Sequence, residues 1–206
     1  VPLYPDRSYI GLAELLQFAN RVMVHSEVRQ GAYTEFPISI RARPVAEGVL
    51  ITDSDPTERK HCVQINQWGM VHSQLYLDDC ARTPEQPPQF YVSWLVAPVD
   101  AFLRYLLVLC RTFSAVQAKP MLLSARVTLP PVSYLIWLDG YLGEVRPSLE
   151  TEIRLLNEVR LPGEIESCAD AFTREMVQRV LWAGGYVFAG QEGEMDNVMK
   201  YLCGRR

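Results

Sequence analysis

The predicted fold is organised around one stretch of the sequence, Tyr33-Thr34-Glu35-Phe36-Pro37-Ile38-Ser39-Ile40-Arg41-Ala42-Arg43. From Glu35 to Arg43, Ile38 and Ile40 alternate with polar residues, which is typical of a strand with one buried face. A similar pattern returns later as Met121-Leu122-Leu123-Ser124-Ala125-Arg126-Val127. The stretch therefore predicts a half-buried strand, and its return favours a second unit of the same kind.

The composition of the 206-residue chain is that of a globular protein. Hydrophobic residues make up 49% and charged residues 21%, so a disordered chain is excluded. The formal net charge of -4 argues against a surface shaped throughout for nucleic acid. The five cysteines form no Cys-x-x-Cys pair, and no apolar run reaches the roughly 20 residues of a membrane span. We expect a cytoplasmic chain without disulfides, metal, cofactor or membrane contact.

The first half of the chain predicts a helix followed by strands. Apolar residues at helical spacing predict the helix, and alternation between turn residues predicts the strands. In chain order the predictions are a helix from Ser8 to about His25, a polar loop over 26–32, the strand 35–43, a turn at Pro44–Gly48, a return strand from Val49, and strands at 61–67 and 71–77 around a tight turn at Trp68-Gly69.

The second half of the chain follows a Pro-rich surface connection over 80–89. Its predicted helices are apolar on one side or more, and its strands lie between turn residues. In chain order the predictions are a strand at 90–96, a deeply buried helix from Pro98 to about Phe113, a hairpin of 120–129 with 132–138, an irregular segment over 141–148, a strand at 152–161, and a helix that opens near Ser167 and ends at Gly184-Gly185.

These elements predict an α+β fold of helix plus antiparallel β-hairpin units with a C-terminal helix. We interpret residues 1–79 and 90–206 as two lobes, with one compact domain as the alternative. Duplication of one unit is a further interpretation. Ile38-Ser39-Ile40-Arg41 aligns with Leu123-Ser124-Ala125-Arg126, and at the same separation Leu50-Ile51 aligns with Leu135-Ile136.

The candidate site residues are polar or aromatic side chains at strand faces and loops. Such residues form an interface or the rim of a ligand site, although their spacing is equally explained by folding. They are Tyr33, Glu35, Arg41, Arg43, Trp68 and Tyr141. Trp182 is another large aromatic, which we interpret as a cap on the core.

Catalytic and metal-binding patterns are weak. His61 and His72 lie on neighbouring predicted strands, and with Asp78 or Asp79 they would form a conceivable metal site. Histidines exposed on strands are commoner, and no His-x-His or His-Glu-x-x-His spacing occurs. We therefore assign no catalytic or metal-binding residue.

Four phrases of the sequence carry a family resemblance. They are Leu3-Tyr4-Pro5 leading into Tyr9-Ile10-Gly11-Leu12, Tyr33-Thr34-Glu35-Phe36-Pro37, Gln67-Trp68-Gly69-Met70-Val71-His72, and Ala97-Pro98-Val99-Asp100-Ala101-Phe102-Leu103. Together they resemble the C-terminal region of bacterial Schlafen/AlbA-type proteins, which are described as DNA-binding or ATP-binding. The resemblance implies that an N-terminal AlbA-like domain carries the nucleic-acid or nucleotide chemistry. The acidic and lysine-containing motif of that domain has no match here, and the chain begins at Val1, so we expect a piece of a longer protein.

Three functions remain open at this point. The first is a non-enzymatic accessory domain for interaction, assembly or regulation, which binds another protein or its own copy. The second is a sensor of a small ligand or nucleotide in a cleft between the lobes. The third, a metal-dependent hydrolase or nuclease around His61 and His72, ranks lowest.

Overall fold

The computed structural model describes residues 10–28, 32–37, 41–52, 61–75, 89–117, 119–128, 134–137, 145–148, 152–186 and 193–203. Helices combine with sheets whose strands pair in antiparallel fashion, except where β7 (Gln89–Tyr91) runs parallel to β9 (Tyr134–Trp137). A helix lies at the C-terminal end of the described chain. The predicted α+β class is confirmed.

The remaining elements fall into helices and four sheets. The helices are α1 (Leu12–Ala19), α2 (Ser93–Thr112), α3 (Ser114–Gln117), α4 (Pro162–Ala183) and α5 (Glu194–Cys203). The sheets are β1 (Val24–Val28) with β2 (Ala32–Phe36); β3 (Ala42–Val45), β4 (Gly48–Thr52), β5 (His61–Asn66) and β6 (Val71–Leu75) in that order; β8 (Met121–Thr128) with β11 (Glu152–Arg160); and β10 (Val145–Ser148), β9 and β7. None of the described helices has the length and apolar character needed to cross a membrane.

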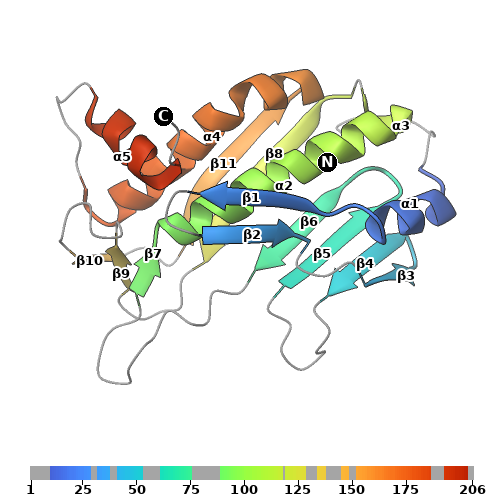
Figure 1. The fold of residues 1–206 in the computed structure, drawn as a ribbon, viewed down its shortest axis with the longest axis horizontal. Helices are drawn as coiled ribbons and strands as arrows, with labels where there is room; N and C mark the ends of the chain where they lie inside the picture. The colour runs from blue at the N-terminus through green and yellow to red at the C-terminus, as the bar shows by residue number, and fades with distance from the viewer. Residues whose placement is uncertain are drawn as a thin grey trace.

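Helix α2 occupies the middle of the molecule (Figure 1). The β1–β2 hairpin and helix α4 both contact it, while α1 contacts β3 and β4 of the four-stranded sheet. Buried apolar residues lie along most of its length, among them Val96, Leu103 and Leu109. The predicted deep burial of this helix is confirmed, and α2 rather than the stretch 33–43 is the element on which the others pack.

Aromatic side chains join these elements into one core. The ring of Phe36, at the end of β2, lies 5.1 Å from Tyr105 and 5.5 Å from Phe102 of α2, between ring centroids. Phe18 of α1 lies 5.5 Å from Tyr105 and 5.3 Å from Phe113. Such edge-to-face contacts add to the free energy gained from burying large rings. Residues on both sides of the connection 80–89 therefore share this core, although most of the connection lies outside the described residues.

The four-stranded sheet follows the predicted order of its strands. Strand β3 pairs with β4 through the turn after Val45, and β5 pairs with β6 through the predicted turn at Trp68-Gly69. Gly69 has φ +82°, a left-handed conformation that glycine adopts without steric strain. Pro44 lies in β3, and β3 is an edge strand, where a missing N–H is tolerated.

The predicted helix to His25 is too long, and the predicted loop over 26–32 is contradicted at both ends, because β1 extends to Val28 and β2 begins at Ala32, with 29–31 outside the described residues. Helix α1 ends at Ala19, where Asn20 donates to the Leu16 carbonyl and accepts from the Ala42 N–H, at 3.0 and 3.1 Å. Strand β1 begins at Val24. Ser26 is a polar residue and therefore favours a loop in the prediction. In the structure Ser26 is buried, and its hydroxyl donates to Asp100 Oδ2 of α2 at 2.7 Å.

The predicted strand over 35–43 is also divided. Strand β2 ends at Phe36, before Pro37, which has no N–H to continue the ladder. Strand β3 begins only at Ala42, and residues 38–40 lie outside the described residues.

The predicted hairpin of 120–129 with 132–138 is wrong. Strand β8 pairs with β11, and β9 pairs with β10 and β7. Met121 and Leu123 of β8 are buried, as are Ile153 and Leu155 of β11, so these two strands bury a common apolar face. The segment 141–148, predicted to be irregular, contains β10. Because β8 is not paired with the strand that follows it, the predicted repeat of the β3–β4 hairpin is absent from the described second half.

Two helix starts lie earlier than predicted, whereas one helix end is confirmed. Helix α2 begins at Ser93 and includes Pro98, so the predicted strand 90–96 is reduced to β7. Helix α4 begins at Pro162, a residue preorganised for the first helical position. It ends at Gly184-Gly185, where the N–H groups of Gly185 and Tyr186 donate to the carbonyls of Trp182 and Leu181 at 2.8 and 2.9 Å. This is a Schellman motif, and Gly185 takes its left-handed position with φ +75°.

Candidate functional site

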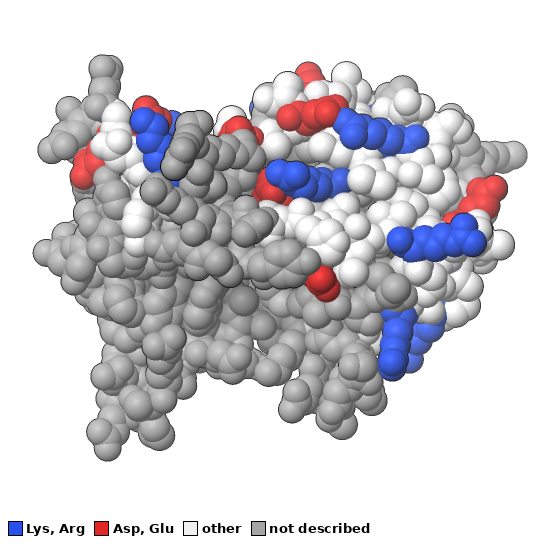
Figure 2. Space-filling model, in the orientation of Figure 1, with Lys and Arg blue, Asp and Glu red and all other residues white. Residues whose placement is uncertain are grey.

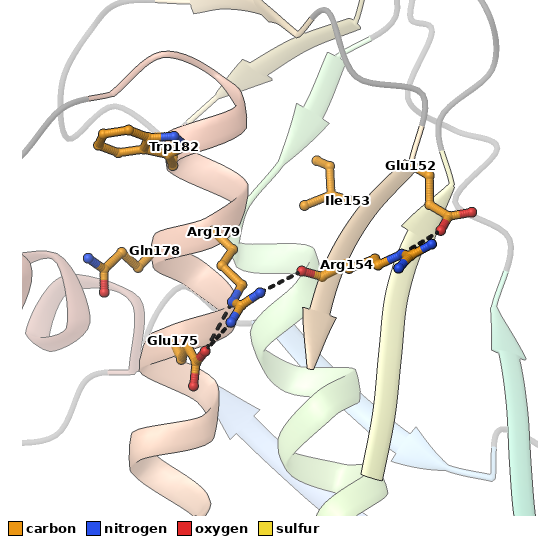
Figure 3. A pocket seen from close by; sticks show the side chains of 7 residues that line it. All are labelled: Glu152, Ile153, Arg154, Glu175, Gln178, Arg179 and Trp182. Atoms are coloured by element: carbon orange, nitrogen blue, oxygen red, sulfur yellow. Dashed lines mark hydrogen bonds and ion pairs between the residues drawn. The ribbon is translucent and has the colours of Figure 1, made fainter. Parts of the chain in front are cut away.

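A groove of about 580 Å³ lies between the C-terminal half of α4 and the start of β11 (Figure 3). It is formed where α4 passes beside the strand that precedes it in the chain. We call this site the α4–β11 groove, and its lining residues are Glu152, Ile153, Arg154, Glu175, Gln178, Arg179 and Trp182. Most of these side chains are charged or polar, and Trp182 is the large aromatic among them.

One helical stripe supplies the α4 wall of the groove. Glu175, Gln178, Arg179 and Trp182 recur at intervals of three and four residues, so they share one face of the helix. The opposite face of α4 is buried through Met176, Val177, Val180 and Leu181. The stripe therefore lies on a face of α4 that the core does not cover.

Arg179 links the two walls of the groove. Its Nε and Nη2 donate to Glu175 Oε1 at 3.0 and 2.5 Å, and its Nη1 donates to the backbone carbonyl of Arg154 at 3.3 Å. Figure 3 shows the guanidinium reaching from α4 toward β11. The contact fixes the direction of the Arg154 carbonyl, which points to α4 and hence away from β8.

Charges of both signs also cover the β11 wall. Arg154 Nε lies 3.3 Å from Glu152 Oε1, and Arg126 Nη1 of β8 lies 3.6 Å from Glu152 Oε2. Arg126 and Arg154 are direct cross-strand partners. These pairs are largely exposed, so they contribute little to stability. On the face shown in Figure 2, acidic and basic side chains lie interspersed over the described part of the surface.

Trp182 is the exposed aromatic of this site. Its exposure is 63%, so the prediction that it caps the core is wrong. The physical reason is the position of Trp182 around the helix. Val180 and Leu181 face the core and are buried, whereas Trp182 lies on the side that faces solvent. That position can be read from the sequence, and it was the signal that would have found both Trp182 and the stripe.

The predicted site residues lie elsewhere in the molecule. Glu35 is on β2, 3.7 Å from Nδ1 of His25 on β1. Arg43 is exposed on β3 opposite Leu50, and Arg41 is exposed just before that strand. Trp68 is half-buried in the β5–β6 turn.

These four residues are divided between the β1–β2 hairpin and the four-stranded sheet, and none of them lines the α4–β11 groove. The side chain of Tyr33 and the whole of Tyr141 lie outside the described residues. The role of the six residues as an interface or ligand rim stays a prediction.

The two histidines on β5 and β6 do not form a joint metal site. His61 is buried against the ring of Phe36, with Nε2 3.2 Å from Ser73 Oγ. His72 is exposed and pairs in register with Gln64, so the alternation of β5 places it on the other face. Among the described residues no group of three or more His, Cys, Asp or Glu side chains is placed to hold a metal ion. Asp78 and Asp79 lie outside those residues.

Two buried groups of α2 have shifted pKa values. Burial raises the pKa of the Tyr105 hydroxyl, and no hydrogen-bond partner for its Oη lies in the described part of the chain. Burial also raises the pKa of the Cys110 thiol to about 11, and its sulfur lies 3.7 Å from that of Met121. Because a reactive cysteine needs an accessible thiolate, Cys110 is suited to packing rather than to nucleophilic chemistry.

Comparison with known proteins gives no relative. No protein-family model, no curated protein and no solved structure matches the chain. The groove must therefore be interpreted from its own residues.

Proposed function

We propose that this chain is a non-enzymatic assembly domain that joins protein chains through the α4–β11 groove. The observation that carries the proposal is the exposure of Trp182 on the same helical stripe as Glu175 and Arg179, beside a strand edge. Tryptophan and arginine are the residues most enriched at the energetic centres of protein interfaces. Removing water from a large exposed aromatic side chain is favourable. Another protein that covers Trp182 and the paired charges around it would therefore bind with a favourable free energy.

The groove suits a protein contact better than a reaction. Its carboxylates, Glu152 and Glu175, both lie against arginine side chains, and no histidine or cysteine lines it. The arrangement offers hydrogen-bond donors and acceptors of both signs around one aromatic side chain. Such a surface can match a complementary surface in register and in charge.

The resemblance to the C-terminal region of Schlafen/AlbA-type proteins supports the same role. In that reading the chain is an accessory domain of a longer bacterial protein in the cytoplasm. Nucleic acid or nucleotide would be handled by a preceding domain, and this chain would hold copies or partners together.

The test is the mass of the purified chain in solution over a wide range of concentration, measured by sedimentation or by light scattering after gel filtration. We expect association that rises with concentration and is weakened by Trp182→Ala. Leu12→Ala serves as the control, since Leu12 is a large exposed apolar residue on α1, away from the groove. A chain that stays monomeric at its solubility limit would contradict self-assembly.

A small-ligand sensor is the second candidate, and the groove itself favours it. Its volume of about 580 Å³ lies in the range of ligand pockets, about 300–1,000 Å³, and Arg154, Arg179 and Trp182 suit an anionic, planar ligand. A ligand of the native state raises the melting temperature. A nucleotide and metabolite panel therefore separates the two functions: a shift abolished by Arg179→Ala favours the sensor, and an unchanged melting temperature opposes it.

A further inference from the structure

Helix α4 has an exposed face along its whole length. The helix has 22 residues, or about 33 Å, and it runs along the outer edge of the molecule in Figure 1. Exposed residues recur on it at intervals of three and four, so they share one face. They are Glu164, Ser167, Ala171, Arg174, Gln178 and Trp182. We call this series the α4 face, and it is flanked by Asp170 and Arg179, which are both exposed.

Each end of the α4 face carries a large exposed apolar side chain. Trp182 lies in the last turn of α4, and Leu161, which is 44% exposed, is the N-cap residue before the first turn. When two α4 helices lie antiparallel, the Trp182 end of each copy meets the Leu161 end of the other. Both side chains then leave water together, which is favourable for apolar surface. The same contact occurs twice, because the pair is symmetric.

The charges of the α4 face reverse along its length. Asp170 lies in the N-terminal half of the helix, and Arg174 follows one turn later on the same side, in the C-terminal half. In an antiparallel pair centred on position 172, Asp170 of each copy lies opposite Arg174 of the other. The same centre brings Glu164 within one residue of Arg179 of the second copy. Opposite charges therefore meet along the whole contact.

The arginines of the α4 face keep their present partners in such a pair. Arg174 donates to Asp196 of α5, and Arg179 donates to Glu175. A guanidinium has five N–H donors, so each arginine can bind a second carboxylate from the other copy. Asp196 and Glu175 thus remain paired within their own chain.

Charge selects both the direction of the pair and its occupant. In a parallel pair about a two-fold axis each residue lies opposite its own copy, so Arg174 meets Arg174 and Asp170 meets Asp170. Such contacts between like charges are destabilising. An antiparallel second copy presents both the charges and the apolar ends in the reversed order. The chain itself is therefore an occupant with the complementary pattern.

We propose that two copies of this chain associate by antiparallel packing of their α4 faces around a two-fold axis near position 172, with Asp170 opposite Arg174 of the second copy. Trp182 of each copy packs beside Leu161 of the other. This inference rests on the proposed assembly function and names its partner and geometry. The contact begins at the Trp182 end of the α4–β11 groove and extends along α4 to its first turn.

Charge reversal tests the pairing at two positions that do not line the groove. Asp170→Arg places two arginines opposite each other, and Arg174→Glu places two acids there, each at both symmetric positions. We expect either variant to raise the dissociation constant of the dimer about tenfold or more. An equal mixture of the two restores opposite charges, so it forms a heterodimer with about the affinity of the wild type. The double variant Asp170→Arg/Arg174→Glu restores the homodimer.

Glu166→Arg is the matched control. Glu166 is an exposed acid of the same helix, but it pairs with Arg111 of α2 and lies outside the α4 face. We expect this variant to leave the dissociation constant unchanged, and its mixture with Arg174→Glu to show no restored association. Circular dichroism and melting temperature report whether each variant is folded.

A second measurement reports the direction of the pair and does not depend on charge. In the antiparallel pair the two copies of residue 171 lie about 3 Å apart along the helix axes, and the two copies of residue 167 about 15 Å apart. A disulfide needs Cα atoms within about 7 Å of each other. Ala171→Cys should therefore form an intermolecular disulfide faster than Ser167→Cys, with the wild type and its five cysteines as the background. Equal rates in the two variants overturn the antiparallel geometry.

The outcomes separate this inference from the proposed function. Association of the wild type that charge reversal leaves unchanged, or that the mixture fails to restore, overturns the α4 pairing and leaves the assembly function standing. A wild type that remains monomeric overturns both.

Discussion

The aromatic core around α2 and the α4–β11 groove use the same residue types in opposite ways. In the core, Phe36 and Tyr105 lie in ring contact and are almost fully removed from solvent. In the groove, Trp182 remains exposed, and arginines pair with carboxylates in water. The core obtains its free energy from burial within the chain, whereas the groove retains surface that only another molecule can bury.

Polar groups also differ between the core and the groove, because buried polar groups need a hydrogen-bond partner and exposed ones do not. In the core, the buried Ser26 hydroxyl donates to Asp100 Oδ2 at 2.7 Å, and the exposed Arg104 donates from Nε to the same oxygen at 2.7 Å from outside the core. Burial makes such a partner necessary, since an unsatisfied polar group costs about 1–3 kcal/mol. In the groove, Arg154 has a side chain 83% exposed, and its ion pair is optional. Stability should therefore respond to changes in the core, and association to changes in the groove.

The largest expected difference is between Phe36→Ala and Trp182→Ala. Phe36 contacts His61, Phe102 and Tyr105, so its removal leaves a cavity among rings that cannot close easily. We expect Phe36→Ala to lower the free energy of unfolding by about 3–5 kcal/mol, measured by urea denaturation. The same truncation at Trp182 should have a far smaller effect, and equal losses at the two positions would contradict the contrast between core and groove.

Alkaline pH should weaken the core. Burial raises the pKa of the Cys110 thiol from 9.0 to about 11, so the unfolded chain loses this proton before the folded chain does. The contribution is fully present below about pH 9 and is lost as the pH rises toward about 11, by about 3 kcal/mol at most. Urea denaturation at increasing pH measures the slope, which Cys110→Ala should reduce. An unchanged slope in that variant would show that Cys110 ionises equally in both states.

Tyr105→Phe tests the unpartnered hydroxyl in the same core. The substitution keeps the ring that packs on Phe18 and Phe36 and removes an Oη that has no hydrogen-bond partner among the described residues. We expect the free energy of unfolding to rise by about 1 kcal/mol, with a matching rise in melting temperature. A loss of stability would reveal a partner for the hydroxyl.

The sequence predicted the elements whose rules are local. The β3–β4 and β5–β6 pairs follow from alternation and short turns, and α4 ends where Gly184-Gly185 permits a Schellman motif. The long-range pair of β8 with β11 was missed, because local spacing favours the next strand in the chain. Ser26 was missed for a different reason, since only Asp100 on α2 makes its burial possible.

The opening stretch 33–43 illustrates the same limit. Its periodicity predicts one strand, but β2 ends at Phe36, before Pro37, and Phe36 joins this stretch to the core through its ring contacts with Phe102 and Tyr105 of α2. For the candidate site, helical phase would have placed Trp182 on the exposed stripe of α4. The β11 wall of the groove could not be predicted, because it depends on the long-range pairing of β8 with β11 and on the hydrogen bond from Arg179 to the Arg154 carbonyl.

The smallest expected effect on stability, at Trp182→Ala, is the sharpest test of the groove. Because the side chain is mostly in solvent, we expect the free energy of unfolding to change by no more than about 0.5 kcal/mol. The same variant should raise the dissociation constant of self-association about tenfold or more, as truncation of an interfacial tryptophan typically does. Sedimentation of the wild type, Trp182→Ala and the control Leu12→Ala measures this. If association is unchanged while stability falls, Trp182 belongs to the core after all. An effect on association alone means that the residue is retained for a contact outside its own chain.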